Sequence, residues 1–159
     1  MDIVKIPSMK KEEYDRLIRE NHISRIAFMG DSYPYIAPFM YVFDEEEKFL
    51  YFLSTKYGKK VGLFEKSPNV AVEIVKYSED MSSYNFVTLQ GRIKEVEDGA
   101  RKKEVKERFI EMIKNKLSST ALAALGYSPD ASAESLLNDE RTFVWKLVDV
   151  KKIVALKNP

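Results

Sequence analysis

The segment Leu50–Pro68 constrains the fold more than any other part of the chain. It begins with an apolar, aromatic run, Leu50–Leu53, which has the composition of a β-strand and leads into two hydroxyl residues, Ser54 and Thr55. The following residues take up helical spacing, with apolar side chains at positions i, i+4 and i+7: Tyr57, Val61 and Phe64. The segment therefore predicts a strand, a short polar connection and a helix.

Lysines gather at the start of this expected helix. Lys56, Lys59 and Lys60 lie close together with Gly58 among them. The N-terminus of a helix carries the positive end of its dipole, so clustered cations there are unfavourable unless an anion is shared. Hydroxyls, lysines and free backbone N–H groups together predict a phosphate site. The alternative is that the lysines are solvated and that the Ser-Thr pair is an ordinary helix cap.

The rest of the chain predicts a mainly β fold with inserted helices, in a single domain over residues 1–159. Strands are expected at Ser24–Met29, Tyr33–Phe43, Lys48–Leu53, Val70–Tyr77, Tyr84–Val96, Thr142–Val148 and Lys152–Leu156. Helices are expected at Met9–Asn21, Tyr57–Lys66, Asp98–Leu117 and Ser118–Leu125, and a loop at Gly126–Asp139. Several antiparallel strands in hairpins with helices between them indicate a small β-barrel. Pro34 and Pro38 predict an edge, a bulge or a bend in their strand.

Composition excludes several classes of function. A net charge of +1 provides no global field for nucleic acid or membrane, so neither is expected as a partner. The chain has no cysteine and one histidine, His22, so neither a metal site nor a Ser-His-Asp triad is expected. The first residues lack the apolar core of a signal peptide, and no run is apolar for long enough to span a bilayer. A cytoplasmic protein is the expectation.

Four segments in order resemble the pyridoxamine 5′-phosphate oxidase-related flavin proteins, and most closely their nitroimidazole-resistance (Nim-type) branch. The resemblance covers residues 9–115 and is carried by the runs Arg25–Pro38, Leu50–Lys60, Ser67–Val72 and Gln90–Arg92. It implies an FMN-binding split β-barrel of six or so antiparallel strands, of Greek-key type. It also implies a homodimer with the flavin at the interface between the subunits.

The resemblance implies a role for individual residues. Ser54, Thr55, Lys59 and Lys60, with Gly58 among them, would hold the FMN phosphate. The backbone of the preceding strand would lie along the isoalloxazine ring, at Pro38, Phe39, Met40 and Tyr41. The partner subunit would add residues from two other strands, for which the candidates are Tyr84, Asn85 and Trp145.

Two departures from the family pattern limit the expected reaction. Nim-type proteins often carry a histidine just before the hydroxyl pair, where this chain has Leu53. Pyridoxamine phosphate oxidases have substrate-binding histidine and arginine near the C-terminus, but Phe143–Pro159 contains neither. Neither nitroimidazole resistance through that histidine nor oxidation of pyridoxamine phosphate is therefore expected.

The expected function is that of an FMN-dependent oxidoreductase whose flavin carries the redox chemistry for a small-molecule substrate. No catalytic acid or base can be named, and the tyrosines near the expected site, Tyr33, Tyr35, Tyr41 and Tyr57, suit a core or an interface equally well. One alternative is a flavin-binding carrier or sensor without turnover. Another is a relative that uses the deazaflavin F420, which the phosphate-binding residues do not distinguish from FMN.

Overall fold

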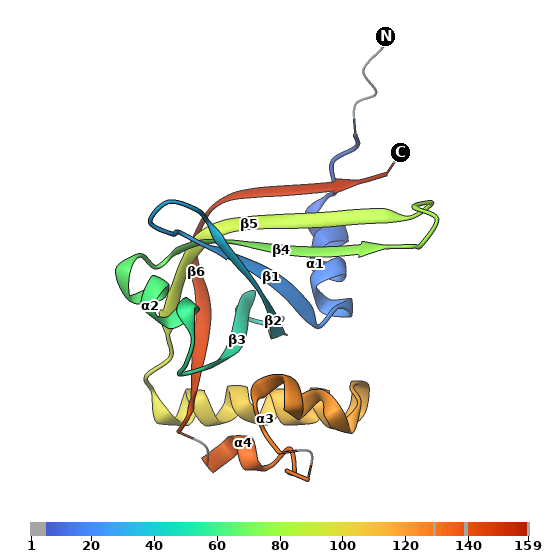
Figure 1. The fold of residues 1–159 in the computed structure, drawn as a ribbon. Helices are drawn as coiled ribbons and strands as arrows, with labels where there is room; N and C mark the ends of the chain where they lie inside the picture. The colour runs from blue at the N-terminus through green and yellow to red at the C-terminus, as the bar shows by residue number, and fades with distance from the viewer. Residues whose placement is uncertain (1–5, 129, 139, 159) are drawn as a thin grey trace.

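The computed structural model describes residues 6–128, 130–138 and 140–158, so residues 1–5 of the predicted domain lie outside it. Six antiparallel strands form a closed barrel in the order β1-β2-β3-β6-β5-β4 (Figure 1). The strands are β1 (Ile23–Phe28), β2 (Tyr35–Asp44), β3 (Phe49–Thr55), β4 (Asn69–Tyr77), β5 (Tyr84–Glu95) and β6 (Thr142–Lys157). The predicted mainly β barrel with inserted helices is confirmed.

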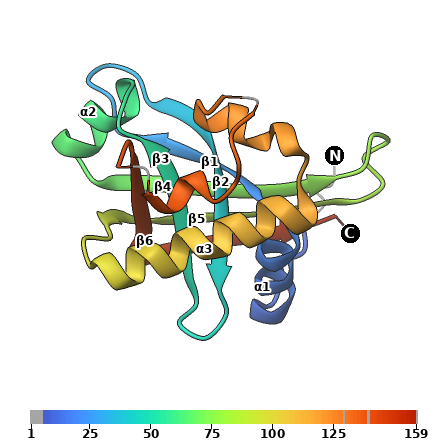
Figure 2. The same ribbon diagram turned by 90° about the horizontal axis from the view of Figure 1, so that it is seen from below.

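Helices cover the sides and one end of this barrel. They are α1 (Lys11–Glu20), α2 (Lys59–Lys66), α3 (Gly99–Lys116), the 3-10 helix η1 (Ser119–Leu125) and α4 (Ser135–Asn138). The longest, α3, runs across one end of the barrel (Figure 2). It starts where Asp98 caps it, since the Asp98 carboxylate accepts the backbone N–H of Ala100 at 2.9 Å.

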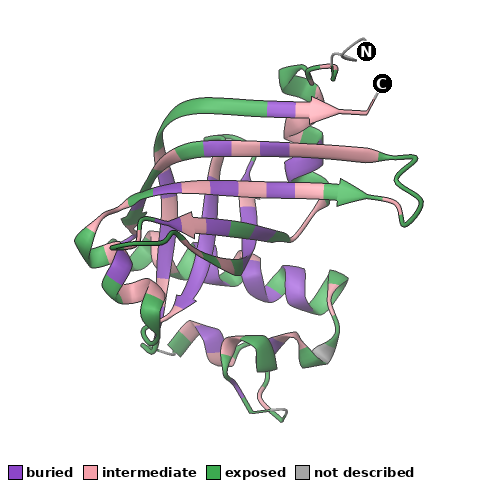
Figure 3. Cartoon of the chain, turned by 45° about the horizontal axis from the view of Figure 1, so that its top comes forward, coloured by how far each residue is buried: buried purple, intermediate pink, exposed green. Residues whose placement is uncertain are grey.

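The core has two parts, which meet at β3. Phe52 faces the barrel interior with Ile26, Phe28 and Trp145, and all four are fully or almost fully buried. The neighbouring residues of β3 face α3 instead and pack in a second cluster: Tyr51 and Leu53. Both faces of β3 are therefore covered, which explains why Leu50–Leu53 is apolar throughout. On the longer strands buried and more accessible residues alternate (Figure 3).

β3 is short, and its pairing leaves the barrel open on both of its sides. Its first residues pair with β2, in the register Phe49 with Asp44 to Phe52 with Tyr41. Its last residues pair with β6, in the register Tyr51 with Lys146 to Thr55 with Thr142. The first half of β2 therefore has no strand partner on the side of β3. The second half of β6 has no strand there either, and its last residues bond instead to the segment before α1, through the bridge between Ser8 and Leu156. These two openings, at opposite ends of β3, are the split of the barrel.

The predicted pair of C-terminal strands, Thr142–Val148 and Lys152–Leu156, is wrong in one respect. The chain forms a single strand, β6, that continues through a bend. Asp149 takes a left-handed backbone conformation there, with φ of 50°. A Cβ atom on Gly91, which lies opposite, would approach the Val148 carbonyl oxygen to 2.8 Å. Only glycine lets β5 come this close, and the register between the two strands shifts at this point.

Two further expectations change in detail. Pro34 precedes β2, and Pro38 lies within it opposite Arg25 of β1. The predicted strand edge is correct, because Pro38 lies in the half of β2 that lacks a β3 partner. The loop expected at Gly126–Asp139 contains the one-turn helix α4. Asp139 itself lies outside the described residues.

Candidate functional site

A cavity of about 440 Å³ lies at the opening between β2 and β3. Five elements line it: the start of β1, the first half of β2, the end of β3, the start of α2 and the end of η1. It brings together most of the predicted site residues, namely Pro38, Phe39, Met40, Thr55, Gly58, Lys59 and Lys60. It is also lined by Ile23, Tyr35, Ala37, Leu53, Ala124 and Leu125.

The start of α2 has no side-chain cap. Gly58 precedes the helix with φ of 98° and ψ of 174°, and no side chain accepts a hydrogen bond from the first turn. The first N–H groups of a helix have no partner within the helix, and the dipole adds positive charge around them. Because the first turn contains lysines and no acidic residue, this end of α2 fits an anion.

Lys60 connects the helix to the end of β3. Its ammonium group donates hydrogen bonds to the hydroxyl of Thr55 at 3.1 Å and to the carbonyl of Tyr57 at 3.2 Å. Burial lowers the pKa of Lys60, since no charged neighbour compensates for the loss of water. An anion placed beside Thr55 and Lys60 would favour the charged form of Lys60 and so offset the effect of burial.

Aromatic rings hold both lysines along the β2 side of the cavity. The Lys59 ammonium lies 5.2 Å from the centre of the Tyr35 ring, and that of Lys60 lies 5.9 Å from the centre of the Phe39 ring. Such contacts favour a cation over a ring face. Within the described chain neither lysine has a carboxylate oxygen within 4.0 Å, so both charges are free to meet a ligand.

The rest of the cavity is lined by backbone and by apolar side chains. Tyr35 to Met40 pair with β1 on one edge only, so polar backbone groups on their other edge have no strand neighbour. Met40, Leu53 and Leu125 add apolar surface. The arrangement combines a cationic end with an apolar wall and an open backbone edge, which suits a phosphate ester that carries a flat ring.

The structure places two more predicted residues next to the cavity rather than in its lining. Ser54 is buried, and its hydroxyl donates to the Thr55 carbonyl at 3.0 Å. Tyr41 is also buried, and its hydroxyl donates to the Ile18 carbonyl of α1 at 2.6 Å. Burial raises the pKa of Tyr41, so this phenol stays protonated. In this chain both side chains hold neighbouring backbone in place.

The three residues expected from a partner subunit do not line the cavity of their own chain. Tyr84 and Asn85 start β5, next to the β4–β5 turn. Trp145 is fully buried, with its ring centre 5.8 Å from that of Phe39, and its indole N–H has no acceptor within the described chain. Trp145 therefore forms a layer directly behind Phe39, a lining residue.

Sequence reasoning missed the wall that η1 provides. Ala124 and Leu125 reach the cavity from a segment about seventy positions after β3 in the chain. Short apolar residues in a 3-10 helix carry no motif, so only the tertiary fold shows their place. Ile23 and Ala37 likewise belong to no motif that the sequence would reveal.

The cavity holds little acid–base chemistry. Among its lining residues the titratable side chains are Lys59, Lys60 and Tyr35. Within the described residues no group of three or more His, Cys, Asp or Glu side chains gathers as a metal site would require. None of the helices described is both long and apolar enough to cross a membrane.

Comparison with known proteins supports the resemblance seen in the sequence. A family model described as pyridoxamine 5′-phosphate oxidase matches residues 10–134. A search of curated proteins found no match to the chain.

Solved structures share the fold at low sequence identity. An FAD-binding protein from Mesorhizobium loti has a TM-score of 0.68 at 17% identity, covering 98% of this chain and 100% of its own. A proposed 5-nitroimidazole antibiotic resistance protein from Bacteroides thetaiotaomicron has a TM-score of 0.65 at 16% identity. The alignment covers 98% of this chain and 91% of that protein. The FAD-binding protein from Mycobacterium smegmatis has a TM-score of 0.61 at 14% identity. The alignment covers 96% of this chain and 98% of that protein.

Proposed function

Because the chain belongs to the pyridoxamine 5′-phosphate oxidase family, we propose that it is a flavoprotein that binds FMN in the cavity between β2 and β3. The observation that carries the proposal is the uncapped start of α2 beside Lys59 and Lys60. Neither lysine has a carboxylate within reach in the described chain. A bound flavin would supply hydride or single-electron transfer. A cytoplasmic oxidoreductase with a small-molecule substrate is the corresponding function.

Each part of the cavity has a role in this proposal. Thr55, Lys59 and Lys60 would bind the phosphate together with the first N–H groups of α2. The open edge of Pro38 to Met40 would contact the ring through its backbone. Ser54 and Tyr41 would hold that geometry through their backbone contacts. Trp145 would act through Phe39, against which it packs.

We also propose that the protein is a homodimer that encloses the flavin. Exposed apolar residues lie at and beside the cavity, since Ile23, which lines it, is 52% exposed and Ile36, between the lining residues Tyr35 and Ala37, is 61% exposed. Exposed aliphatic residues next to a ligand cavity suit a protein interface. Tyr84 and Asn85 would then reach the flavin of the partner subunit rather than that of their own chain.

A second function is favoured by the shortage of acid–base groups. Neither a carboxylate nor a histidine lines the cavity, and Leu53 stands where Nim-type proteins often have histidine. A flavin carrier or sensor needs no such group, whereas proton-coupled reduction of a substrate usually needs one. The cavity supports binding in both functions, and turnover separates them.

The test is a spectrum of the purified protein, followed by identification of the released cofactor and titration with FMN, riboflavin, FAD and F420. We expect a flavin spectrum, release of FMN, and affinity for FMN at least about 100-fold above that for riboflavin, which lacks the phosphate. Equal affinity for riboflavin, or preference for FAD or F420, would contradict FMN as the cofactor. Assays with reduced nicotinamide and a quinone or nitro acceptor then distinguish an oxidoreductase from a carrier.

A further inference from the structure

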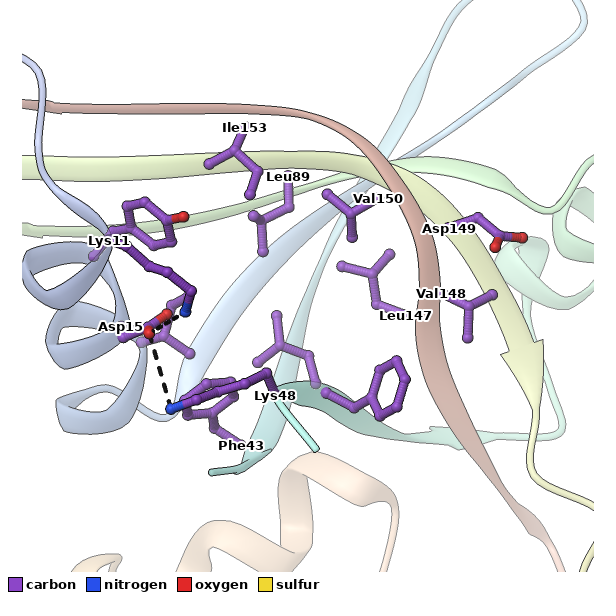
Figure 4. A pocket seen from close by; sticks show the side chains of 14 residues that line it. Lys11, Asp15, Phe43, Lys48, Leu89, Leu147, Val148, Asp149, Val150 and Ile153 are labelled. Atoms are coloured by element: carbon purple, nitrogen blue, oxygen red, sulfur yellow. Dashed lines mark hydrogen bonds and ion pairs between the residues drawn. The ribbon is translucent and has the colours of Figure 1, made fainter. Parts of the chain in front are cut away.

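A second cavity, of about 290 Å³, lies at the other opening of the barrel, between α1 and the bend of β6 (Figure 4). It exists because β6 leaves β3 after Lys146 and continues beside β5, until its end meets Ser8 before α1. The start of β3 is therefore unpaired on this side, and α1 covers the opening only in part. The flavin proposal makes no use of this cavity.

Apolar side chains form the floor and part of the rim. Leu50, Leu89 and Leu147 lie at the floor and are each at most 6% exposed. Val150 and Ile153 lie on the rim and are 41% and 43% exposed. Figure 4 shows Leu89, Leu147 and Ile153 grouped on one side of the space between α1 and β6. The floor can bury an apolar group, and the two exposed residues at the rim can cover it.

The charges at the mouth are unbalanced. The Asp15 carboxylate lies 2.5 Å from the Lys11 ammonium, a hydrogen bond that raises the pKa of Lys11. The Lys48 ammonium is 3.9 Å from the same carboxylate, too far for a hydrogen bond. Asp149 also lines the cavity, but it points away from both lysines (Figure 4) and pairs with Arg92 at 2.5 Å. One carboxylate, Asp15, thus faces two ammonium groups, which leaves a net charge of +1 at the mouth.

Two residues that line this cavity have strained backbone. Non-glycine residues with positive φ in the described chain are Lys48, Met81 and Asp149, and the cavity is lined by Lys48 (φ 61°) and Asp149 (φ 50°). A left-handed conformation is costly for a long side chain such as lysine, and turns normally place glycine or asparagine there. Strain of this kind concentrates at ligand sites, and here it places a cation at the mouth of an apolar cavity.

We propose that this cavity binds a small carboxylic acid with an apolar chain. The carboxylate would meet Lys48, the ammonium that Asp15 holds more loosely, and the chain would lie on Leu89 and Leu147. A net charge of +1 at the mouth suits a monoanion. A cavity at the low end of the size range of ligand sites suits a chain of medium length.

The test is a titration of the full-length protein with octanoate, octanol and octylamine, followed by backbone amide NMR. We expect octanoate to shift the amide signals of Leu89, Val150 and Ile153. It should bind about tenfold more tightly than octanol, because a hydrogen bond to a charged group is lost with the alcohol. Octylamine should bind more weakly than either. Equal affinity for octanoate and octanol, or shifts confined to the β2–β3 cavity, would overturn the proposal.

Two variants make the test specific. Lys48→Asn should weaken octanoate binding about tenfold and leave octanol unchanged. It should keep or raise the melting temperature, since asparagine tolerates positive φ. The matched control is Lys76→Asn, at an exposed position of β4 outside the cavity, which should leave octanoate binding unchanged. Ile153→Trp, at the exposed rim, should fill the mouth and abolish octanoate binding. Unchanged octanoate affinity in both cavity variants would refute the site.

Discussion

Cations occur at both ends of the β2–β3 hairpin, and their surroundings differ. At the open end, Lys59 and Lys60 line a cavity and have no carboxylate within reach in the described chain. At the turn end, the Asp44 carboxylate lies 2.7 Å from the Arg101 guanidinium and 3.3 Å from that of Arg108. The arginines at the turn end are thus matched by a buried carboxylate, and the lysines at the open end are not.

The difference separates a structural role from a binding role. Arg101 also donates to the Tyr51 hydroxyl at 2.9 Å, and this hydrogen bond, followed by the one to Asp44, raises its pKa. The guanidinium therefore joins α3 to both strands of the hairpin and has little capacity left for a ligand. The lysines stabilise nothing comparable in the chain, which leaves their charge for an anion from outside.

The largest effect should come from removing the unmatched charges. Lys59→Ala combined with Lys60→Ala should weaken FMN binding by about 100-fold or more, because charge-assisted phosphate contacts are lost. The free energy of unfolding should change by only about 0.5 kcal/mol, as for an ordinary surface substitution. Fluorescence titration with FMN and chemical denaturation measure the two quantities. Lys66→Ala, in the last turn of the same helix, is the matched control and should retain FMN affinity.

Removing a matched charge should do the opposite. Arg101→Met leaves the nearly buried Asp44 carboxylate with Arg108 alone, and should lower the free energy of unfolding by about 2–3 kcal/mol. FMN affinity should stay within about twofold at a temperature where the variant is folded. A variant that kept its stability but lost FMN would reverse the comparison between the two ends of the hairpin.

Glycine substitutions in and before α2 should show a smaller, purely conformational effect. Gly58→Ala must adopt φ of 98°, which should cost about 1–2 kcal/mol of stability, although nothing but the Lys60 ammonium lies within 4 Å of the added Cβ. Gly62→Ala, within the helix and with nothing within 4 Å, should instead stabilise by about 0.5–1 kcal/mol. Thermal denaturation of both variants checks the contrast. Equal effects of the two substitutions would show that the Gly58 conformation matters little.

The smallest effect should be a dependence on pH at the matched end. Burial raises the pKa of Asp44, but backbone N–H groups and Arg101 outweigh it, so the net pKa is below its ordinary 3.8. The charged form is therefore favoured in the folded state, and its stability is present above pH 3.8 and lost as pH falls through the lowered pKa. Asp44→Asn should be less stable than the wild type at pH 7, and the difference should shrink in urea titrations near pH 3. A difference that is constant with pH would argue against the charge as its cause.

The local segment around the lysines could be predicted because its signals are short-range. A strand, two hydroxyls, a glycine and a helix follow one another in the chain, and the structure builds the start of α2 from those residues. The barrel could likewise be expected from alternating strands in hairpins.

Long-range features could not be predicted in the same way. The continuous β6 depends on Gly91 of a different strand, which accepts the close approach of Val148. The η1 wall depends on the packing of apolar residues that carry no motif. The ion pair between Arg101 and Asp44 joins residues that are 57 positions apart in the chain. The resemblance placed Trp145 at a partner's flavin, and that role stays a prediction; only the tertiary fold shows that the Trp145 ring lies in the core of its own chain.

The short β3 has a consequence for how the barrel opens. Only Tyr51 and Phe52 are paired on both sides, with β2 and with β6. The sheet is continuous between these strands across two residues, and the cavities lie beyond each end of that overlap. Regions with few backbone ladder bonds exchange their amide hydrogens through local fluctuations rather than global unfolding. The seam opens only if its buried side chains also part, because Tyr41, Tyr51, Phe52 and Trp145 are each at most 1% exposed.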